Sequence, residues 1–94
     1  MLFKFNHVTQ ITSEQCSDML NKWMENNYDQ SIPHCEFWCC EEDENGIMWY
    51  TVIDNIDGTF LMESFRTPEA AHAWLRSVDV DVCYKIESII LESE

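Results

Sequence analysis

The sequence predicts a single α+β domain in which an antiparallel sheet packs against two helices. Two segments carry apolar residues at helical spacing, and between them lie three short segments rich in strand-forming residues. Asn45-Gly46 and Asp57-Gly58 separate those three segments, as expected for turns between antiparallel strands. The chain has 94 residues, of which 46% are hydrophobic, so it can bury one small core and is too apolar to be a disordered acidic tail.

The N-terminal third predicts a strand and then a helix. Residues 3–11 (FKFNHVTQI) are rich in strand formers, so we expect a first strand there. Thr12 and Gln15 fit a capping box that starts a helix, and the apolar pattern carries this helix to about Asn27. Its expected buried stripe consists of apolar residues at intervals of three and four: Cys16, Met19, Leu20, Trp23, Met24 and Tyr28.

The middle of the chain predicts a three-stranded meander, with strands over residues 36–43, 47–54 and 59–65. Asn45-Gly46 favours a two-residue type I′ turn, because both positions of that turn need positive φ. Such a turn pairs Trp38 with Ile53 and therefore fixes which residues share a face of the sheet.

This register predicts one apolar face and one mixed face. The apolar face comprises Trp38, Cys40, Trp49, Ile53, Phe60 and Met62. The mixed face comprises Phe37, Cys39, Glu41, Asp43, Met48, Tyr50, Val52, Asp54, Leu61, Glu63 and Phe65. If the helices cover the first face, the second is an exposed surface that combines aromatic and acidic side chains.

The C-terminal third predicts a second helix and one ambiguous segment. Thr67 is suited to the N-cap, Pro68 to the first helical position, and Glu69 to the positive end of the helix dipole. The expected buried stripe of this helix is Ala71, Trp74, Leu75 and Val78. Residues 82–94 (VCYKIESIILESE) fit either a further strand of the sheet or a last helix.

Charge is the unusual property of this sequence. There are 18 Asp and Glu residues against 5 Lys and Arg residues, which gives a formal net charge of -13. Such a chain repels nucleic acid and anionic membranes, and it is attracted to basic protein surfaces. The N-terminal residues do not resemble a secretory leader and no run of apolar residues is long enough to span a bilayer, so we expect a cytoplasmic protein with reduced thiols.

The cysteines and histidines do not form a strong metal or catalytic motif. His34, Cys35, Cys39 and Cys40 lie close together in sequence, but Cys39 and Cys40 point to opposite faces of a regular strand. A zinc site of His34, Cys35, Cys39 and a distant Cys83 stays open as an alternative, whereas packing of the thiols as small hydrophobes is the simpler interpretation. The acids after Cys40 disfavour a reactive thiolate, and the chain contains no glycine-rich phosphate loop. We therefore expect neither a cofactor nor enzymatic activity.

The candidate binding surface is acidic, with aromatic anchors. Four acids lie at the hairpin tip: Glu41, Glu42, Asp43 and Glu44. Asp54 and Glu63 would lie on the mixed face with Tyr50 and Phe37 as apolar anchors, and Glu14, Asp18 and Glu25 would form a stripe on the first helix. Carboxylates at alternate positions of one strand are about 6.8 Å apart, whereas duplex DNA carries one charge per about 1.7 Å of its axis. One sheet face therefore has a lower charge density than DNA, and a mimic of DNA would need the helix stripe as well. An ordinary solvated face is the alternative interpretation.

Residues 49–75 (WYTVIDNIDGTFLMESFRTPEAAHAWL) combine a hairpin with an acidic turn, a Thr-Pro-Glu-Ala-Ala helix start and a Trp-Leu helix. In this arrangement of a hairpin, an acidic turn and a helix, the chain resembles small phage and prophage proteins, among them anti-CRISPR and other anti-defence inhibitors. The resemblance implies a stoichiometric inhibitor that occupies a basic, nucleic-acid-binding surface of a host complex, and it implies no particular site residues. The alternative is a small assembly subunit, a homodimer formed through an apolar sheet face, whose acidity serves only solubility.

Overall fold

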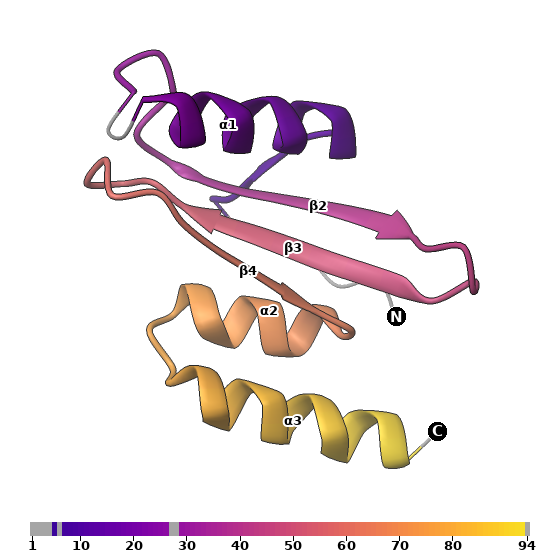
Figure 1. Cartoon of the computed structure of the whole chain (residues 1–94). Helices are drawn as coiled ribbons and strands as arrows, with labels where there is room; N and C mark the ends of the chain where they lie inside the picture. The colour runs from indigo at the N-terminus through magenta and orange to yellow at the C-terminus, as the bar shows by residue number, and fades with distance from the viewer. Residues whose placement is uncertain (1–4, 6, 27–28, 94) are drawn as a thin grey trace.

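The computed structural model describes residue 5 and residues 7–26 and 29–93, and these form a four-stranded mixed sheet and three helices (Figure 1). The elements in chain order are β1 (Thr9–Gln10), α1 (Ser13–Glu25), β2 (Glu36–Glu42), β3 (Met48–Asp54), β4 (Leu61–Phe65), α2 (Pro68–Leu75) and α3 (Val80–Glu92). The strand order in the sheet is β1-β2-β3-β4. β2, β3 and β4 form the expected antiparallel meander, whereas β1 runs parallel to β2.

The α+β class, the meander and the two helices are confirmed by the structure, together with their caps. The Thr12 side chain accepts from the Gln15 amide at 3.1 Å and the Gln15 side chain accepts from the Thr12 amide at 2.8 Å, which completes the capping box of α1. The Thr67 hydroxyl caps α2 by accepting from the Ala70 amide at 3.3 Å. Asn27 and Tyr28, the expected end of the first helix, lie outside the described residues.

The expectation of an antiparallel N-terminal strand over residues 3–11 is wrong in length and direction. Only Thr9 and Gln10 form strand within the described residues, and residues 3, 4 and 6 lie outside them. His7 has a φ of 63°, which interrupts the extended conformation just before β1. Because α1 connects β1 to its neighbour β2 and carries the chain back along the sheet, the two strands run parallel.

The ambiguous C-terminal segment is a helix, so no C-terminal strand joins the sheet in the described chain. The Asp79 side chain caps α3 by accepting from the Asp81 amide at 2.9 Å. Cys83 and Glu87, four residues apart, are both buried on its inner side, which is the helical interval rather than the alternation of a strand. None of the helices in the described residues is long and apolar enough to cross a membrane.

Helices cover both faces of the sheet (Figure 1). α1 lies on one face, and the buried residues of the layer between this helix and the sheet are Cys16, Ile32, Phe37, Cys39, Ile53 and Phe60. α2 lies on the other face with α3 beside it, and the buried residues there are Phe5, Val52, Phe65, Ala70, Ala71 and Cys83. The small core predicted for this chain is therefore divided into two layers by the sheet.

Candidate functional site

The hairpin between β2 and β3 closes with a three-residue loop instead of the predicted two-residue turn. The Gly46 amide donates to the Asp43 carbonyl at 3.0 Å, and the Asp43 amide donates to the Ile47 carbonyl at 2.8 Å. Gly46 has a φ of 78°, so the loop is a type I turn followed by a glycine in the left-handed region. The Asp43 carboxylate fixes this loop, because its Oδ1 atom accepts from the backbone amides of Asn45 and Ile47, both at 2.9 Å.

The extra loop residue shifts the pairing of β2 with β3 by one position. Trp38 faces Val52 rather than Ile53, and Glu41 faces Trp49 rather than Tyr50. A shift by one residue moves the whole set of β2 side chains to the opposite face relative to β3. Glu41 and Tyr50, expected on one face, therefore lie on opposite faces, while the relation between β3 and β4 is as predicted.

The predicted exposed mixed face does not exist as such, since α2 and α3 cover it. Val52 and Phe65 are completely buried there, and Tyr50 is half-buried against the same cluster. Burial is the main cause that raises the pKa of Tyr50, with the charges of Cys40 and Glu69 adding to it. The expected position of Phe37 as an exposed anchor is also wrong, because Phe37 is 3% exposed and packs beneath α1.

Asp54 and Glu63 are engaged within the fold. Asp54 accepts from the Ile56 amide at 3.2 Å, and it faces Glu36 across the sheet. Burial and the charge of Asp54 raise the pKa of Glu36. Glu63 accepts from the Tyr84 hydroxyl of α3, and this hydrogen bond is the main cause that raises the pKa of Tyr84 to about 12. Both carboxylates therefore have structural roles that the sequence did not predict.

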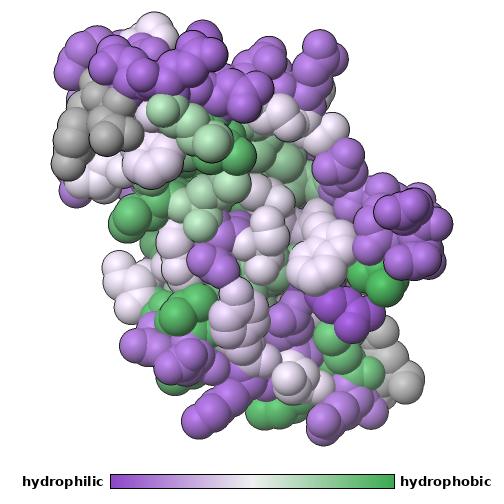
Figure 2. All heavy atoms as spheres, viewed as in Figure 1, coloured by the Kyte–Doolittle hydropathy of each residue, from purple (hydrophilic) through white to green (hydrophobic). Residues whose placement is uncertain are grey.

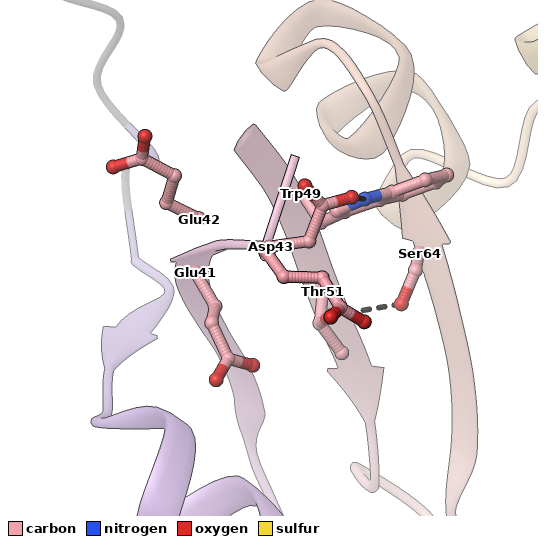
Figure 3. A pocket seen from close by; sticks show the side chains of 7 residues that line it. Glu41, Glu42, Asp43, Trp49, Thr51 and Ser64 are labelled. Atoms are coloured by element: carbon pink, nitrogen blue, oxygen red, sulfur yellow. Dashed lines mark hydrogen bonds between the residues drawn. The ribbon is translucent and has the colours of Figure 1, made fainter. Parts of the chain in front are cut away.

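The hairpin tip projects past the N-terminal end of α1 (Figure 1). A hollow lies at the tip, beside the adjoining part of the sheet. Its volume is about 470 Å³, and it is lined by Glu41, Glu42, Asp43, Glu44, Trp49, Thr51 and Ser64. Figure 3 shows Thr51 and Ser64 on adjacent strands, joined by a hydrogen bond of 2.8 Å between their hydroxyl groups. All four acids predicted at the tip are thus brought together around one concave surface.

Trp49 and Asp43 are linked within the wall of this hollow. The Trp49 indole donates to Asp43 Oδ2 at 3.0 Å (Figure 3). This bond is the main cause that lowers the pKa of Asp43, together with the amide of Ile47, that of Asn45 and the positive charge of Arg66. Both oxygens of Asp43 already accept hydrogen bonds, so Asp43 shapes the hollow, whereas its glutamate neighbours hold the charge that a ligand would meet.

Three residues of the hollow, Trp49, Thr51 and Ser64, were not predicted as site residues. Trp49 was assigned to a covered apolar face, yet it is 36% exposed, because α1 ends before it reaches this part of the sheet. The pair of hydroxyl residues on adjacent strands was a usable signal, since paired polar residues are unusual on a face that is otherwise apolar.

The acidic stripe predicted on the first helix is present but separate. Glu14, Asp18 and Glu25 are all exposed on α1, with Lys22 between them. Figure 2 shows hydrophilic side chains over α1 and a second hydrophilic group at the hairpin tip. The two predicted acidic sets therefore lie apart, and the set at the tip surrounds the hollow.

The thiols are packing groups, with one exception. Cys16, Cys39 and Cys83 are buried, and every cysteine is a free thiol. A hydrogen bond with Cys16 and burial together raise the pKa of Cys39 far above its usual range. Cys40 is exposed, contrary to its expected place in a covered apolar face, and the shifted register places it opposite Tyr50 instead of Thr51.

The alternative zinc site of His34, Cys35, Cys39 and Cys83 is not assembled. Cys39 belongs to the cluster beneath α1, whereas Cys83 belongs to the cluster on the other side of the sheet. The described part of the chain contains no group of three or more His, Cys, Asp or Glu side chains that could hold a metal ion.

Comparison of the chain with protein-family models, with curated proteins and with solved structures finds no match.

Proposed function

We propose that this protein is a non-enzymatic binding protein whose acidic hairpin tip occupies a basic, nucleic-acid-binding surface of a host complex. In this proposal it acts in the host cytoplasm as a phage-encoded inhibitor of the anti-CRISPR or anti-restriction type. The hairpin, acidic turn and helix start of residues 49–75 resemble those of such inhibitors, and this resemblance supports a nucleic-acid-handling complex as the partner. The net charge of -13 supports attraction to a basic surface.

The observation that carries the proposal is the hollow at the hairpin tip. Glu41, Glu42 and Glu44 surround it, and the exposed Trp49 ring forms an apolar wall beside them. Basic side chains of a partner would find carboxylates for charge-assisted hydrogen bonds and an aromatic face for a cation–π contact. The three-residue loop held by Asp43 presents these groups in a fixed arrangement, which lowers the entropy cost of binding.

The geometry at the tip supports blocking of a basic surface better than full mimicry of DNA. The acids of the tip are concentrated around one hollow, and the helix stripe of Glu14, Asp18 and Glu25 lies apart from them. The proposed contact is therefore local: the tip inserts between basic side chains, and the stripe contributes mainly to long-range attraction.

The test begins with capture of partners by tagged protein at low and at high salt, followed by mass spectrometry. We expect a basic nucleic-acid-handling complex that is retained at low salt and released at high salt. Retention that does not depend on salt would contradict the electrostatic mechanism, as would capture of acidic partners only.

A pair of matched variants then locates the contact. Glu41→Lys with Glu44→Lys reverses two charges at the tip, and Glu14→Lys with Glu25→Lys makes the same change on α1. We expect the tip variant to bind the captured complex at least about tenfold more weakly than the α1 variant, with both folded. Equal losses in the two variants would mean that the overall field, rather than the hollow, holds the partner.

The alternative of an assembly subunit that dimerises through an apolar sheet face finds no support in this fold. α1 covers the apolar part of one face and α2 covers that of the other. Self-association would have to use a different surface.

A further inference from the structure

The outer side of α3 is an apolar groove on an otherwise acidic molecule. Ile89 is 67% exposed and Val82 is 44% exposed, although the helix is held to α2 and β4 by its inner side. The groove has a volume of about 400 Å³ and is lined by Tyr84, Lys85, Ser88, Ile89 and Glu92. Figure 2 shows hydrophobic side chains at the surface over α3, among hydrophilic ones.

The charges in this groove are symmetric about its centre. Lys85 and Glu92 lie equally far from the midpoint between Ser88 and Ile89, one toward each end of α3. If a second α3 runs antiparallel with its midpoint at the same level, each Lys85 lies opposite the Glu92 of the other copy. The two resulting ion pairs would be about 10 Å apart along the helix, with Ser88 of one copy opposite Ile89 of the other between them.

We propose that this groove is a self-association surface on which a second copy of the chain docks its own α3 in antiparallel orientation. The Lys85 and Glu92 pattern is complementary to itself, and within the described residues neither side chain forms an ion pair. Glu92 lies in the last turn of α3, where the helix dipole disfavours an acid, and that turn has no basic residue. Lys85 of the second copy would supply the missing positive charge.

Charge also favours a copy over a basic partner at this surface. The lining of the groove contains one Lys and one Glu, whereas the acidic sets at the hairpin tip and on α1 lie elsewhere. A basic partner would be attracted to those acidic regions first. The small Ser88 at the centre allows two helices to approach closely, and the exposed Ile89 then loses its contact with water.

The contact is small, so the association should be weak. α3 has 13 residues and is about 20 Å long, and one such helix covers less than the roughly 800 Å² per partner of a standard interface. We expect a dissociation constant of about 10 µM or weaker. A dimer of this kind leaves both hairpin tips free, so it would present two acidic hollows to a partner with repeated sites.

Sedimentation equilibrium over a wide concentration range tests the proposal, with single and paired charge reversals. Lys85→Glu alone sets acid against acid at both pairs, and Glu92→Lys alone sets base against base, so each variant should be monomeric at concentrations where the unmodified chain dimerises. The double variant should dimerise again, because the exchange restores both attractive pairs. A mixture of the two single variants should also form dimers, since the mixed pair has only attractive contacts.

Matched controls separate this contact from net charge. Lys22→Glu and Glu25→Lys make the same charge changes on exposed positions of α1 and should leave the dissociation constant within about twofold of the unmodified chain. Ile89→Ser should weaken the dimer by removing the apolar contact at its centre. Higher salt should strengthen the dimer by screening the repulsion of two chains of charge -13, the reverse of its effect on the proposed partner binding.

A chain that stays monomeric at every concentration would overturn the proposal. Dimers that form equally in both single variants would overturn it too. The proposal would also be overturned if the double variant and the mixture both stayed monomeric while all variants remained folded. None of these results bears on the acidic hollow, which is tested by partner capture.

Discussion

Replacement of Asn55 by alanine should destabilise the whole domain, although Asn55 lies in a turn. Asn55 is 2% exposed, and its side chain joins the turn between β3 and β4 to the loop that precedes β2. Its amide nitrogen donates to the Pro33 carbonyl at 2.9 Å and to the Ile32 carbonyl at 3.4 Å. Its carbonyl oxygen accepts from the amide of Phe60 at 3.1 Å.

The magnitude follows from what each group loses. The Phe60 amide is buried and would be left unpaired, at a cost of about 1–3 kcal/mol. The Pro33 carbonyl would lose its hydrogen bond from Asn55 but would still accept from the Cys35 amide at 3.0 Å. The loss of this bond and of the long bond from Asn55 to the Ile32 carbonyl therefore adds only about 1 kcal/mol. We therefore expect a loss of about 2–4 kcal/mol, a large share of the roughly 5–14 kcal/mol typical of a chain this size.

Asn55 also holds Phe60 in an unfavourable backbone conformation. Phe60 has a φ of 52°, and its ring stacks on Trp23 of α1 with centroids 5.7 Å apart. A left-handed conformation costs a residue with a side chain about 1–2 kcal/mol, so other contacts must hold it. Without the Asn55 oxygen, Phe60 is expected to relax and to loosen the packing beneath α1.

Urea unfolding followed by tryptophan fluorescence measures this effect, with Asn21→Ala on the exposed side of α1 as the matched control. The control should change the free energy of unfolding by less than about 0.5 kcal/mol. A loss below about 1 kcal/mol for Asn55→Ala would contradict this expectation, because it would mean that water or a rearranged turn satisfies the Phe60 amide.

Three further predictions concern the hairpin. Gly46→Ala should cost about 1–2 kcal/mol in urea unfolding, because Gly46 has a φ of 78°; an unchanged midpoint would contradict the left-handed loop. The folded pKa of Asp43 is below its unfolded value, so the stability from Asp43 is present above its usual pKa of 3.8 and is lost as pH falls through the lowered value. In an NMR titration the indole proton of Trp49 should report this lowered pKa, and Asp43→Asn should abolish the transition. Cys40 is exposed, so a thiol reagent should modify it before the buried thiols, and Cys40→Ser should remove that fast phase.

The sequence was sufficient to predict those parts of the fold that depend on local chemistry. Thr12 and Thr67 have side-chain oxygens that cap helices, and both act as predicted. The apolar spacing of the first helix placed Cys16 correctly in the core. Met24 fits the same spacing but is 67% exposed, because only tertiary packing decides how wide the buried side of a helix is.

The register of the hairpin could not be decided by the Asn-Gly pair alone. The residues Asp43-Glu44-Asn45-Gly46 fit a two-residue turn at Asn45-Gly46, and they fit equally a type I turn with Asp43 first and Gly46 last. Burial distinguishes the two, because the longer loop lets Phe37 and Ile53 share a face. That choice gives the sheet two apolar faces, and each needs a helix to cover it. The correct register and the placement of the two predicted helices on opposite faces would therefore have had to be predicted together.

The same distinction between local and tertiary chemistry divides the acidic residues. Five of the described aspartates accept a hydrogen bond from the backbone amide two residues later: Asp29, Asp43, Asp54, Asp57 and Asp79. This is the turn chemistry that favours a short carboxylate side chain, and glutamate is too long to repeat it in the same way. Much of the aspartate charge therefore shapes turns, and it offers a partner fewer free oxygen atoms than the net charge suggests. Glu41, Glu42 and Glu44 surround the hollow without such turn bonds, so the affinity for a basic surface should depend on the glutamates of the tip, whereas its shape depends on Asp43.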